Sequence, residues 1–178
     1  MKFNRSVKSL LSIAIFGLTA QIAHASNDPH SIVFGVAPGP YGELVKLAIE
    51  PGLEKKGYHV EIREFSDYVQ PNLALSNNSI DANLFQHRLY LEKFSADKGL
   101  NLSPLINVPT AGIGLYSHQI KSLDELKKGD IITLSNDPTN LARGLRFLAK
   151  LGLITFKADI DPTKASEKDI ASNPRGLI

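Results

Sequence analysis

EFSDYVQPNLALSNNSIDANLFQHRLY, residues 64–90 of the chain, contains two strand-like runs with a short helix between them. The first run continues the strand that Val60 and Ile62 predict by alternating with polar residues, and the second is Ile80–Phe85. Most polar and aromatic residues of this stretch do not fit a simple core pattern. We therefore expect a functional site at the ends of these strands, where α/β sheets place their ligands.

The residues around this stretch predict further strands and helices. Ser31–Ala37 is a continuous apolar run, which is typical of a buried strand in a parallel sheet. Glu43–Lys56 has apolar residues at helical spacing, and Pro51 should kink or split that helix because it lacks a backbone N–H donor. Leu89–Lys98 predicts a helix that ends at Gly99.

The second half of the chain continues this alternation, which predicts an α/β fold with a mainly parallel sheet. Its clearest helix begins at Asp137 and Pro138, which suit the N-cap and the first helical position, and ends at Gly152. The other predicted elements are strands at Leu102–Val108, Ala111–Tyr116 and Asp130–Leu134 and a short capped helix at Ser122–Leu126.

Two strand–helix sets flank the segment Val108–Tyr116, which indicates two lobes with a crossover near Leu115–Lys121. We expect the first lobe to cover residues 26–113 and the second to cover residues 114–178. The second lobe is expected to be incomplete, because its long helix is followed only by a polar stretch and the segment Ser172–Ile178, whose last few residues resemble the beginning of another strand.

Residues 1–25 predict a secretory signal peptide. They open with three basic residues, and the apolar run at residues 10–20 is too short to span a membrane. A small-x-small cleavage site follows at residues 23–25. The chain has a net charge of +2, but this leader holds three of its 20 basic residues and none of its 18 acidic residues. The signal peptide predicts a periplasmic or secreted protein. Because the remainder of the chain is slightly acidic, we expect no nucleic-acid partner.

Enzyme and metal signatures are not found in the sequence. It has no cysteine, which excludes disulfides, thiolate metal sites and a cysteine nucleophile. Phosphate-binding glycine motifs and the G-x-S-x-G elbow are missing, and its five histidines have no metal-ligand spacing. An enzyme using Asp67, Asp81 and His87 is an alternative, although nothing in the sequence sets these residues beside one another. We expect no catalytic residue, no metal and no cofactor.

Four side chains near the strand ends suit an amphipathic small molecule. Rings at Tyr68, Phe85, His87 and Tyr90 can enclose an apolar group while keeping polar atoms available. The alternative, which periodicity alone favours, places Phe85 and Tyr90 in the core and Tyr68 on the surface.

Two residues of the long helix suit a carboxylate ligand. Arg143 can form a two-pronged pair with a carboxylate near a helix N-terminus that favours anions. Asn140 lies in the first turn and can supply an amide. The alternative is a solvated helix face, because Arg143, Arg146 and Lys150 share the side opposite the apolar residues.

A series of motifs runs along the chain in a fixed order: GVAPGP at 35–40, FSDYVQPN at 65–72, DANLFQHRLYL at 81–91, GLYS at 114–117, SLDEL at 122–126, NDPTN at 136–140 with Arg143, and Asn173-Pro174. The series resembles the NLPA lipoprotein family, the methionine-binding receptors of ABC importers. The resemblance implies a periplasmic-binding-protein fold, with two α/β lobes, a hinge and a ligand cleft.

The same resemblance implies a ligand and a set of contacts. The ligand would be L-methionine or a close derivative, delivered to a membrane complex of permease and ATPase by a receptor expected to be monomeric. The family's aromatic cage resembles Tyr68, Phe85, His87 and Tyr90, and its carboxylate-holding arginine resembles Arg143.

The sequence departs from the family pattern in two respects. It lacks the lipid-bearing cysteine after the leader, and it ends before the region that completes the second lobe and supplies asparagine contacts to the ligand. The main expectation is therefore an exported receptor without a lipid anchor. The alternative is a truncated family remnant with impaired or no ligand binding.

Overall fold

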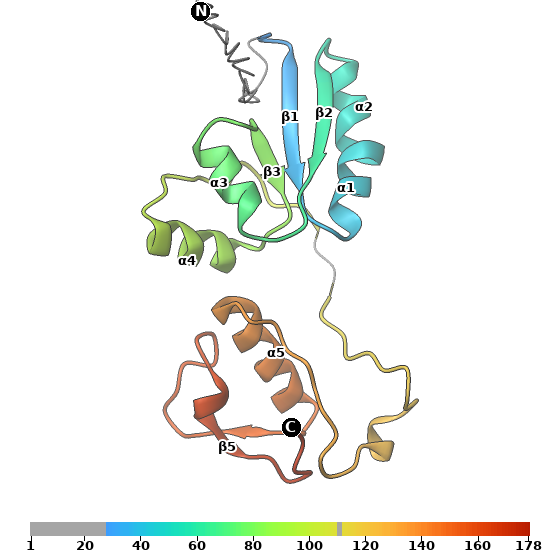
Figure 1. Cartoon of the computed structure of the whole chain (residues 1–178), viewed down its shortest axis with the longest axis vertical. Helices are drawn as coiled ribbons and strands as arrows, with labels where there is room; N and C mark the ends of the chain where they lie inside the picture. Colours follow the sequence, from blue (N-terminus) through green and yellow to red (C-terminus); the bar gives the residue numbers. More distant parts are fainter. Residues whose placement is uncertain (1–27, 110–111) are drawn as a thin grey trace, which may run out of the picture.

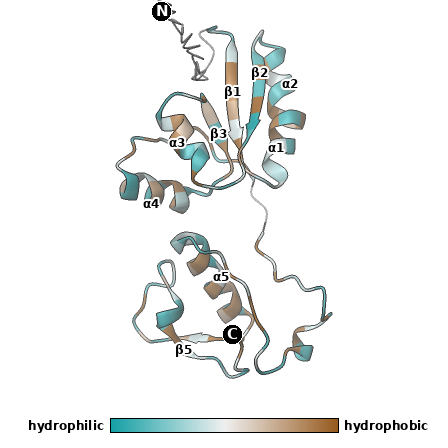
Figure 2. Ribbon diagram, viewed as in Figure 1, coloured by the Kyte–Doolittle hydropathy of each residue, from teal (hydrophilic) through white to brown (hydrophobic). Residues whose placement is uncertain are grey.

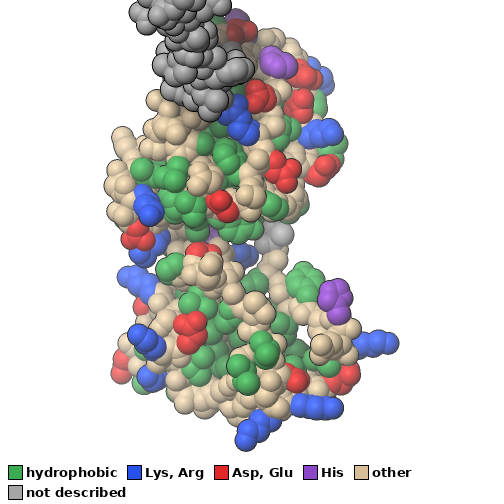
Figure 3. Space-filling model, viewed as in Figure 1, with side chains coloured by type: hydrophobic (Ala, Val, Ile, Leu, Met, Phe, Trp, Pro, Cys, Tyr) green, Lys and Arg blue, Asp and Glu red, His purple; other side chains and the backbone are tan. Residues whose placement is uncertain are grey.

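The computed structural model describes residues 28–109 and 112–178, so the predicted signal peptide lies outside the described residues. The described residues form two lobes, the first built on a three-stranded sheet and the second on the longest helix (Figure 1). In these two ranges no helix is both long and apolar enough to cross a membrane. Charged side chains of both signs are dispersed over the face that Figure 3 shows.

The first lobe contains a parallel sheet in the order β2-β1-β3, as the alternation of elements predicted. Its strands are β1 (Ser31–Val36), β2 (His59–Glu64) and β3 (Ala82–Leu84). The apolar run of β1 takes the central position. A Cβ at Gly35 would lie 2.5 Å from Ile80 Cδ1, so any larger residue there would require the Ile80 side chain to shift.

A helical run follows β1 and packs beside β2 (Figure 1). It consists of α1 (Pro40–Leu44), a π-helical segment η1 (Val45–Ile49) and α2 (Glu50–Glu54), so it begins earlier than predicted. The predicted split occurs as a wide π turn directly before Pro51, which accommodates a residue that cannot donate to the preceding turn.

Two helices flank β3 in the chain, α3 (Gln70–Ser76) before it and α4 (Arg88–Lys98) after it. Helix α4 ends at Gly99, whose φ of 65° is left-handed and which fulfils the predicted role of C-terminal cap. All three strands run in one direction, so the segments that follow β2 and β3 meet at one edge of the sheet.

The second lobe is organised around α5 (Pro138–Lys150). The apolar face of α5 packs against Leu153, Ile154 and the apolar residues near η2 (Leu123–Glu125). The hydrophobic residues of α5 appear as brown segments of its ribbon in Figure 2. The remaining elements are a short antiparallel pair, β4 (Thr155–Phe156) and β5 (Ile170–Ser172), and the 3-10 turn η3 (Glu167–Asp169). The sequence patterns did not predict this pair.

Two predicted strands are wrong. Leu102–Val108 and the described part of 111–116 are extended but join neither sheet, and Leu105 and Ile106 remain 90% and 82% exposed. A run with strand propensity becomes a strand only when a neighbouring backbone completes its hydrogen bonds.

No strand is assigned at Asp130–Leu134 either, but this segment does have a backbone partner. Ile132 N–H donates to the Ile178 carbonyl at 2.8 Å, and Ile178 N–H donates to the Asp130 carbonyl at 2.9 Å. This is the hydrogen-bond pattern of a parallel pair. The contacts of Ile178 therefore agree with the prediction that the last few residues begin a strand.

Candidate binding site

Aromatic side chains gather at the carboxyl end of the first-lobe sheet. Tyr68 follows β2, Phe85 follows β3, and Tyr90 lies in the first turn of α4. The rings of Tyr68 and Phe85 are stacked with centroids 5.8 Å apart, and Phe85 meets Tyr90 edge-on at 6.0 Å. Phe85 and Tyr90 are 6% and 7% exposed, whereas Tyr68 is 46% exposed. The cluster therefore has a buried base and one half-exposed ring.

The Tyr90 hydroxyl ties this cluster together. It donates a hydrogen bond of 2.8 Å to the backbone carbonyl of Tyr68. Burial raises the pKa of Tyr90, and the negative charges of Asp137 and Asp67 and the neighbouring Tyr68 raise that pKa further. The hydroxyl is therefore a neutral donor at physiological pH, and it fixes the loop after β2 against α4.

His87 connects the first lobe to the second. It is the N-cap residue of α4, where its Nδ1 accepts the Tyr90 backbone N–H at 3.1 Å. Because Nδ1 is an acceptor, the ring proton lies on Nε2, which is 3.1 Å from Asn140 Oδ1. His87 Nε2–H thus donates to a residue of α5, and the hydrogen bond crosses between the lobes.

Asp137 fixes the position of Asn140 at the start of α5. As N-cap residue, its Oδ1 accepts the Asn140 backbone N–H at 2.9 Å and the Thr139 hydroxyl at 2.8 Å. Its Oδ2 accepts Asn140 Nδ2 at 3.0 Å, which leaves Asn140 Oδ1 for His87. Burial alone would raise the pKa of Asp137, but these hydrogen bonds lower it below its usual value. The carboxylate therefore stays charged at the helix N-terminus.

Arg143 lies one turn beyond Asn140, so both project from the same side of α5. It is partly buried, as is Arg146, whereas Lys150 further along the helix is exposed. The predicted alternative of a fully solvated basic face therefore describes Lys150 better than Arg143. Of the six predicted residues, His87 and Asn140 are in direct contact across the lobes, and Tyr90 and Arg143 lie on helices α4 and α5, which contact each other.

The sequence patterns did not identify a cluster of three amides between α3 and β3. Asn72 is fully buried and hydrogen-bonds to Asn83, which lies in β3, and to Gln86, which follows β3. The only sign of this cluster in the sequence was that three amide residues occur in the motif region. Their mutual contact depends on how α3 packs on the sheet.

A separate groove of about 640 Å³ is lined by residues 81–88 and 101–108. It shares Phe85 and His87 with the predicted site, but the other four predicted residues do not line it. Within the described ranges, no three His, Asp or Glu residues lie close enough together to hold a metal ion. The six predicted residues thus supply rings, one amide and one guanidinium group, with the Asp137 carboxylate beside Asn140.

Comparison with known proteins points to one family. The model of the family described as NlpA lipoprotein matches residues 32–178. The probable D-methionine-binding lipoprotein MetQ of Vibrio cholerae is 42% identical over 180 residues, which cover 99% of this chain and 66% of that protein. The D-methionine-binding lipoprotein MetQ of Escherichia coli K12 is 42% identical over 152 residues, covering 84% of this chain and 55% of that protein.

Solved structures give the same result. A crystal structure of the methionine-binding protein MetQ matches with a TM-score of 0.80 and 41% identity, covering 84% of this chain and 61% of that one. An ABC transporter periplasmic substrate-binding protein from Coxiella burnetii matches with a TM-score of 0.76 and 39% identity, covering 82% of this chain and 61% of that one. The chain thus spans less than two thirds of the length of these relatives. The predicted fold class, a two-lobed α/β fold of the periplasmic-binding-protein type with a partial second lobe, is confirmed.

Proposed function

Because this chain belongs to the NlpA lipoprotein family, as its motif series predicted, we propose that it is an exported receptor that binds methionine for an ABC importer. The proposal is supported by relatives named as D-methionine-binding lipoproteins and by a similar structure titled as a periplasmic substrate-binding protein of an ABC transporter. The ligand would bind unchanged between the lobes, without chemical conversion.

The observation that carries the proposal is the hydrogen bond between His87 and Asn140. It links the ring cluster of the first lobe with the N-terminal turns of α5. Methionine has an apolar thioether chain at one end and charged groups at the other. We propose that Tyr68, Phe85, His87 and Tyr90 contact the thioether chain.

The second lobe would hold the polar end of the ligand. We propose that Arg143 pairs with the carboxylate through its guanidinium group and that Asn140 supplies an amide contact. The first turns of α5 favour an anion at this place, because their free N–H groups carry partial positive charge. Asp137 would attract the ligand's ammonium group, since its lowered pKa keeps it charged.

The remaining parts of the proposal concern location and partners. We propose that residues 1–25 are cleaved on export, that the mature protein acts in the periplasm or outside the cell, and that its partner is a membrane permease–ATPase complex. A first lobe over 26–113 and a second over 114–178 would act as a monomer that closes on its ligand.

A second candidate function is that of a family member with impaired or no ligand binding. The observation that favours it is the exposure of Leu105 and Ile106 beside an apolar groove, since large exposed apolar surface is unusual in a complete soluble domain. This candidate predicts a broad unfolding transition and binding of a hydrophobic dye by the native protein.

A thermal melt with L-methionine, with D-methionine and without ligand distinguishes these candidates. A ligand that binds only the folded state stabilises it by about 2.7 kcal/mol at 100 times its dissociation constant. We expect a cooperative melt whose midpoint rises with methionine and stays unchanged with leucine. A cooperative melt that methionine leaves unchanged would reject methionine as the ligand. A broad melt would favour the second candidate.

Recovery of the ligand tests the absence of conversion. We expect methionine to be recovered intact after long incubation with the protein. Loss of methionine would instead favour the enzyme alternative that uses Asp67, Asp81 and His87.

A further inference from the structure

Three amide side chains form a closed network at the carboxyl end of β3. Asn72 Nδ2 donates to Gln86 Oε1 at 2.8 Å, and Gln86 Nε2 donates to Asn72 Oδ1 at 2.7 Å, so the two amides pair face to face. Asn83 Nδ2 donates to Asn72 Oδ1 at 2.9 Å and to the Pro71 carbonyl at 3.3 Å. Gln86 Nε2 also donates to Asn83 Oδ1 at 3.2 Å. The network joins α3 to the segment after β3.

Because Asn72 is buried, every polar group of its side chain needs a hydrogen-bond partner within the protein. Its side chain is 0% exposed, and a buried amide is tolerated only when its donors and acceptors find partners. Each partner must therefore stay in place, because a displaced amide would leave a buried polar group unsatisfied. The network defines one position for the Gln86 side chain relative to α3.

Gln86 lies in the chain between two residues of the proposed site. Phe85 carries the ring stacked on Tyr68, and His87 carries the nitrogen that contacts Asn140. Holding the Gln86 side chain fixes the backbone on which both neighbours stand. Asn72 itself cannot touch a ligand, since none of its surface is exposed.

We infer that Asn72, together with Asn83 and Gln86, positions Phe85 and His87 for ligand binding. The inference rests on the proposed function for its effect on methionine, but the positioning itself is a property of the protein alone. Replacing Asn72 would then weaken binding indirectly, because Phe85 and His87 would lose the orientation that the ligand requires.

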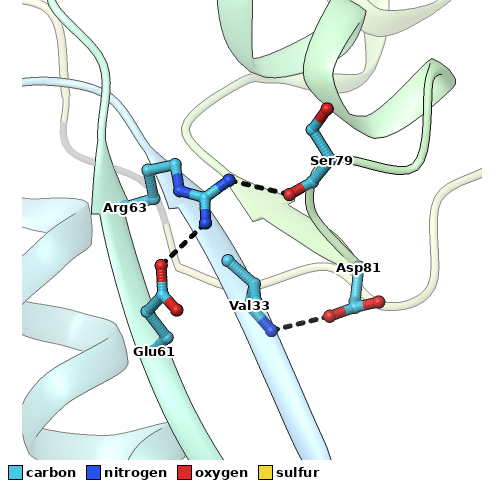
Figure 4. Close-up of polar contacts among 5 residues, drawn as sticks. All are labelled: Val33, Glu61, Arg63, Ser79 and Asp81. Atoms are coloured by element: carbon cyan, nitrogen blue, oxygen red, sulfur yellow. Dashed lines mark hydrogen bonds and ion pairs between the residues drawn. The ribbon is translucent and has the colours of Figure 1, made fainter. Parts of the chain in front are cut away.

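The opposite end of β3 supplies a matched control. There Asp81 Oδ2 accepts the Val33 backbone N–H at 2.7 Å, and Arg63 Nη1 donates to the Ser79 carbonyl at 2.8 Å (Figure 4). The first contact joins the residue before β3 to β1, and the second joins β2 to the turn before β3. Both lie at the start of β3, whereas Phe85 and His87 follow its end. Loss of the Asp81 acceptor should reduce stability without moving residues 85–87.

The experiment compares the full chain with three variants, Asn72→Leu, Gln86→Met and Asp81→Ala. The first readout, in ligand-free protein, is hydrogen exchange of the Tyr90 backbone amide, which His87 Nδ1 accepts. We expect about fivefold faster exchange in the first two variants, because the cap relaxes when residues 85–87 are released. Asp81→Ala should leave the Tyr90 amide unchanged relative to neighbouring amides of α4.

The second readout is methionine affinity, measured well below the melting temperature of each variant. We expect Asn72→Leu and Gln86→Met to weaken binding about fivefold or more, and Asp81→Ala to leave it unchanged. A double variant that combines Asn72→Leu with Gln86→Met should lose less affinity than the sum of the two single losses, because neither amide is then left without its partner.

The possible results separate the inference from the proposed function. Unchanged Tyr90 exchange in both amide variants would overturn the inference, as would equal losses of affinity in all three variants. Faster Tyr90 exchange in the amide variants, with no methionine binding by the unaltered chain, would support the positioning role and reject methionine as the ligand.

Discussion

The two lobes fix their candidate site residues in different ways. In the second lobe, Asn140 is oriented by Asp137, three residues earlier in the same helical turn. In the first lobe, Phe85 and His87 depend on residues far away in the sequence, such as Tyr68 and Asn72. We call the second-lobe residues the local half of the site and the first-lobe residues the non-local half. When packing is weakened, the residues of the non-local half should become disordered first.

The largest expected effect comes from breaking the first-lobe half. Phe85→Ala should destabilise the protein by about 3–5 kcal/mol, because it removes a buried ring and leaves a cavity between Tyr68 and Tyr90. Chemical denaturation measures this loss. Leu148→Ala is the control in the second-lobe core, and it should reduce stability while retaining more of the methionine affinity. Equal affinity in the two variants would contradict a special role for the Phe85 ring.

A second prediction concerns the charged group of the second-lobe half. Arg143→Ala should weaken methionine binding by about 2 kcal/mol, the typical contribution of a hydrogen bond to a charged group. Isothermal titration calorimetry measures the change. Lys150→Ala on the same helix should bind methionine like the unaltered chain, since Lys150 is exposed near the end of α5. Unchanged affinity in Arg143→Ala would show that the carboxylate is held elsewhere.

The local half can be tested by its N-cap. Asp137→Ala should reduce stability by about 1 kcal/mol, because α5 loses its cap. The pKa of Asp137 is lowered in the folded state, so its ionisation stabilises the fold above the unfolded-state pKa of about 3.9. That contribution disappears as the pH falls through the lower folded-state pKa.

Asp137→Asn is the matched control, because asparagine also caps helices but does not titrate. It should keep most of the stability at neutral pH and lose the part of the acid dependence that Asp137 causes. Denaturation curves from pH 2 to 7 compare the variants. An unchanged acid dependence in Asp137→Asn would reject the assigned role of this carboxylate.

A similarly small effect is expected from Tyr90→Phe. The ring stays, but the hydrogen bond to the Tyr68 carbonyl is lost, which should reduce stability by about 1 kcal/mol. Tyr116→Phe is the control, because Tyr116 is 88% exposed. A melt in which both variants match the unaltered chain would mean that the hydroxyl does not hold the loop after β2.

The difference between local and non-local contacts also explains which features could be predicted from the sequence. Helix α5 was predicted with its cap and its apolar face because Asp137, Pro138 and the leucine spacing are local signals. The first-lobe sheet was predicted because the apolar run of β1 and the alternation in β2 are also local. Motif resemblance predicted the family, and the structure brings two of the six candidate residues, His87 and Asn140, into contact across the lobes.

The errors arose where structure depends on a distant partner. Leu102–Val108 has strand propensity but no neighbouring strand in the described residues, so it stays extended. The pair β4–β5 is too short to give a periodic signal. The burial of Asn72 follows from the packing of α3 on the sheet, which no spacing of residues within the sequence expresses.

The hydrogen bond between His87 and Asn140 has a consequence for the speed of ligand capture. Both partners belong to the proposed contact surface, so this hydrogen bond must break before a ligand can contact them. The observed association rate should then level off at high ligand concentration, at the rate of that opening. At high ligand concentration, the opening of the protein would limit the rate of capture, and diffusion of the ligand would not.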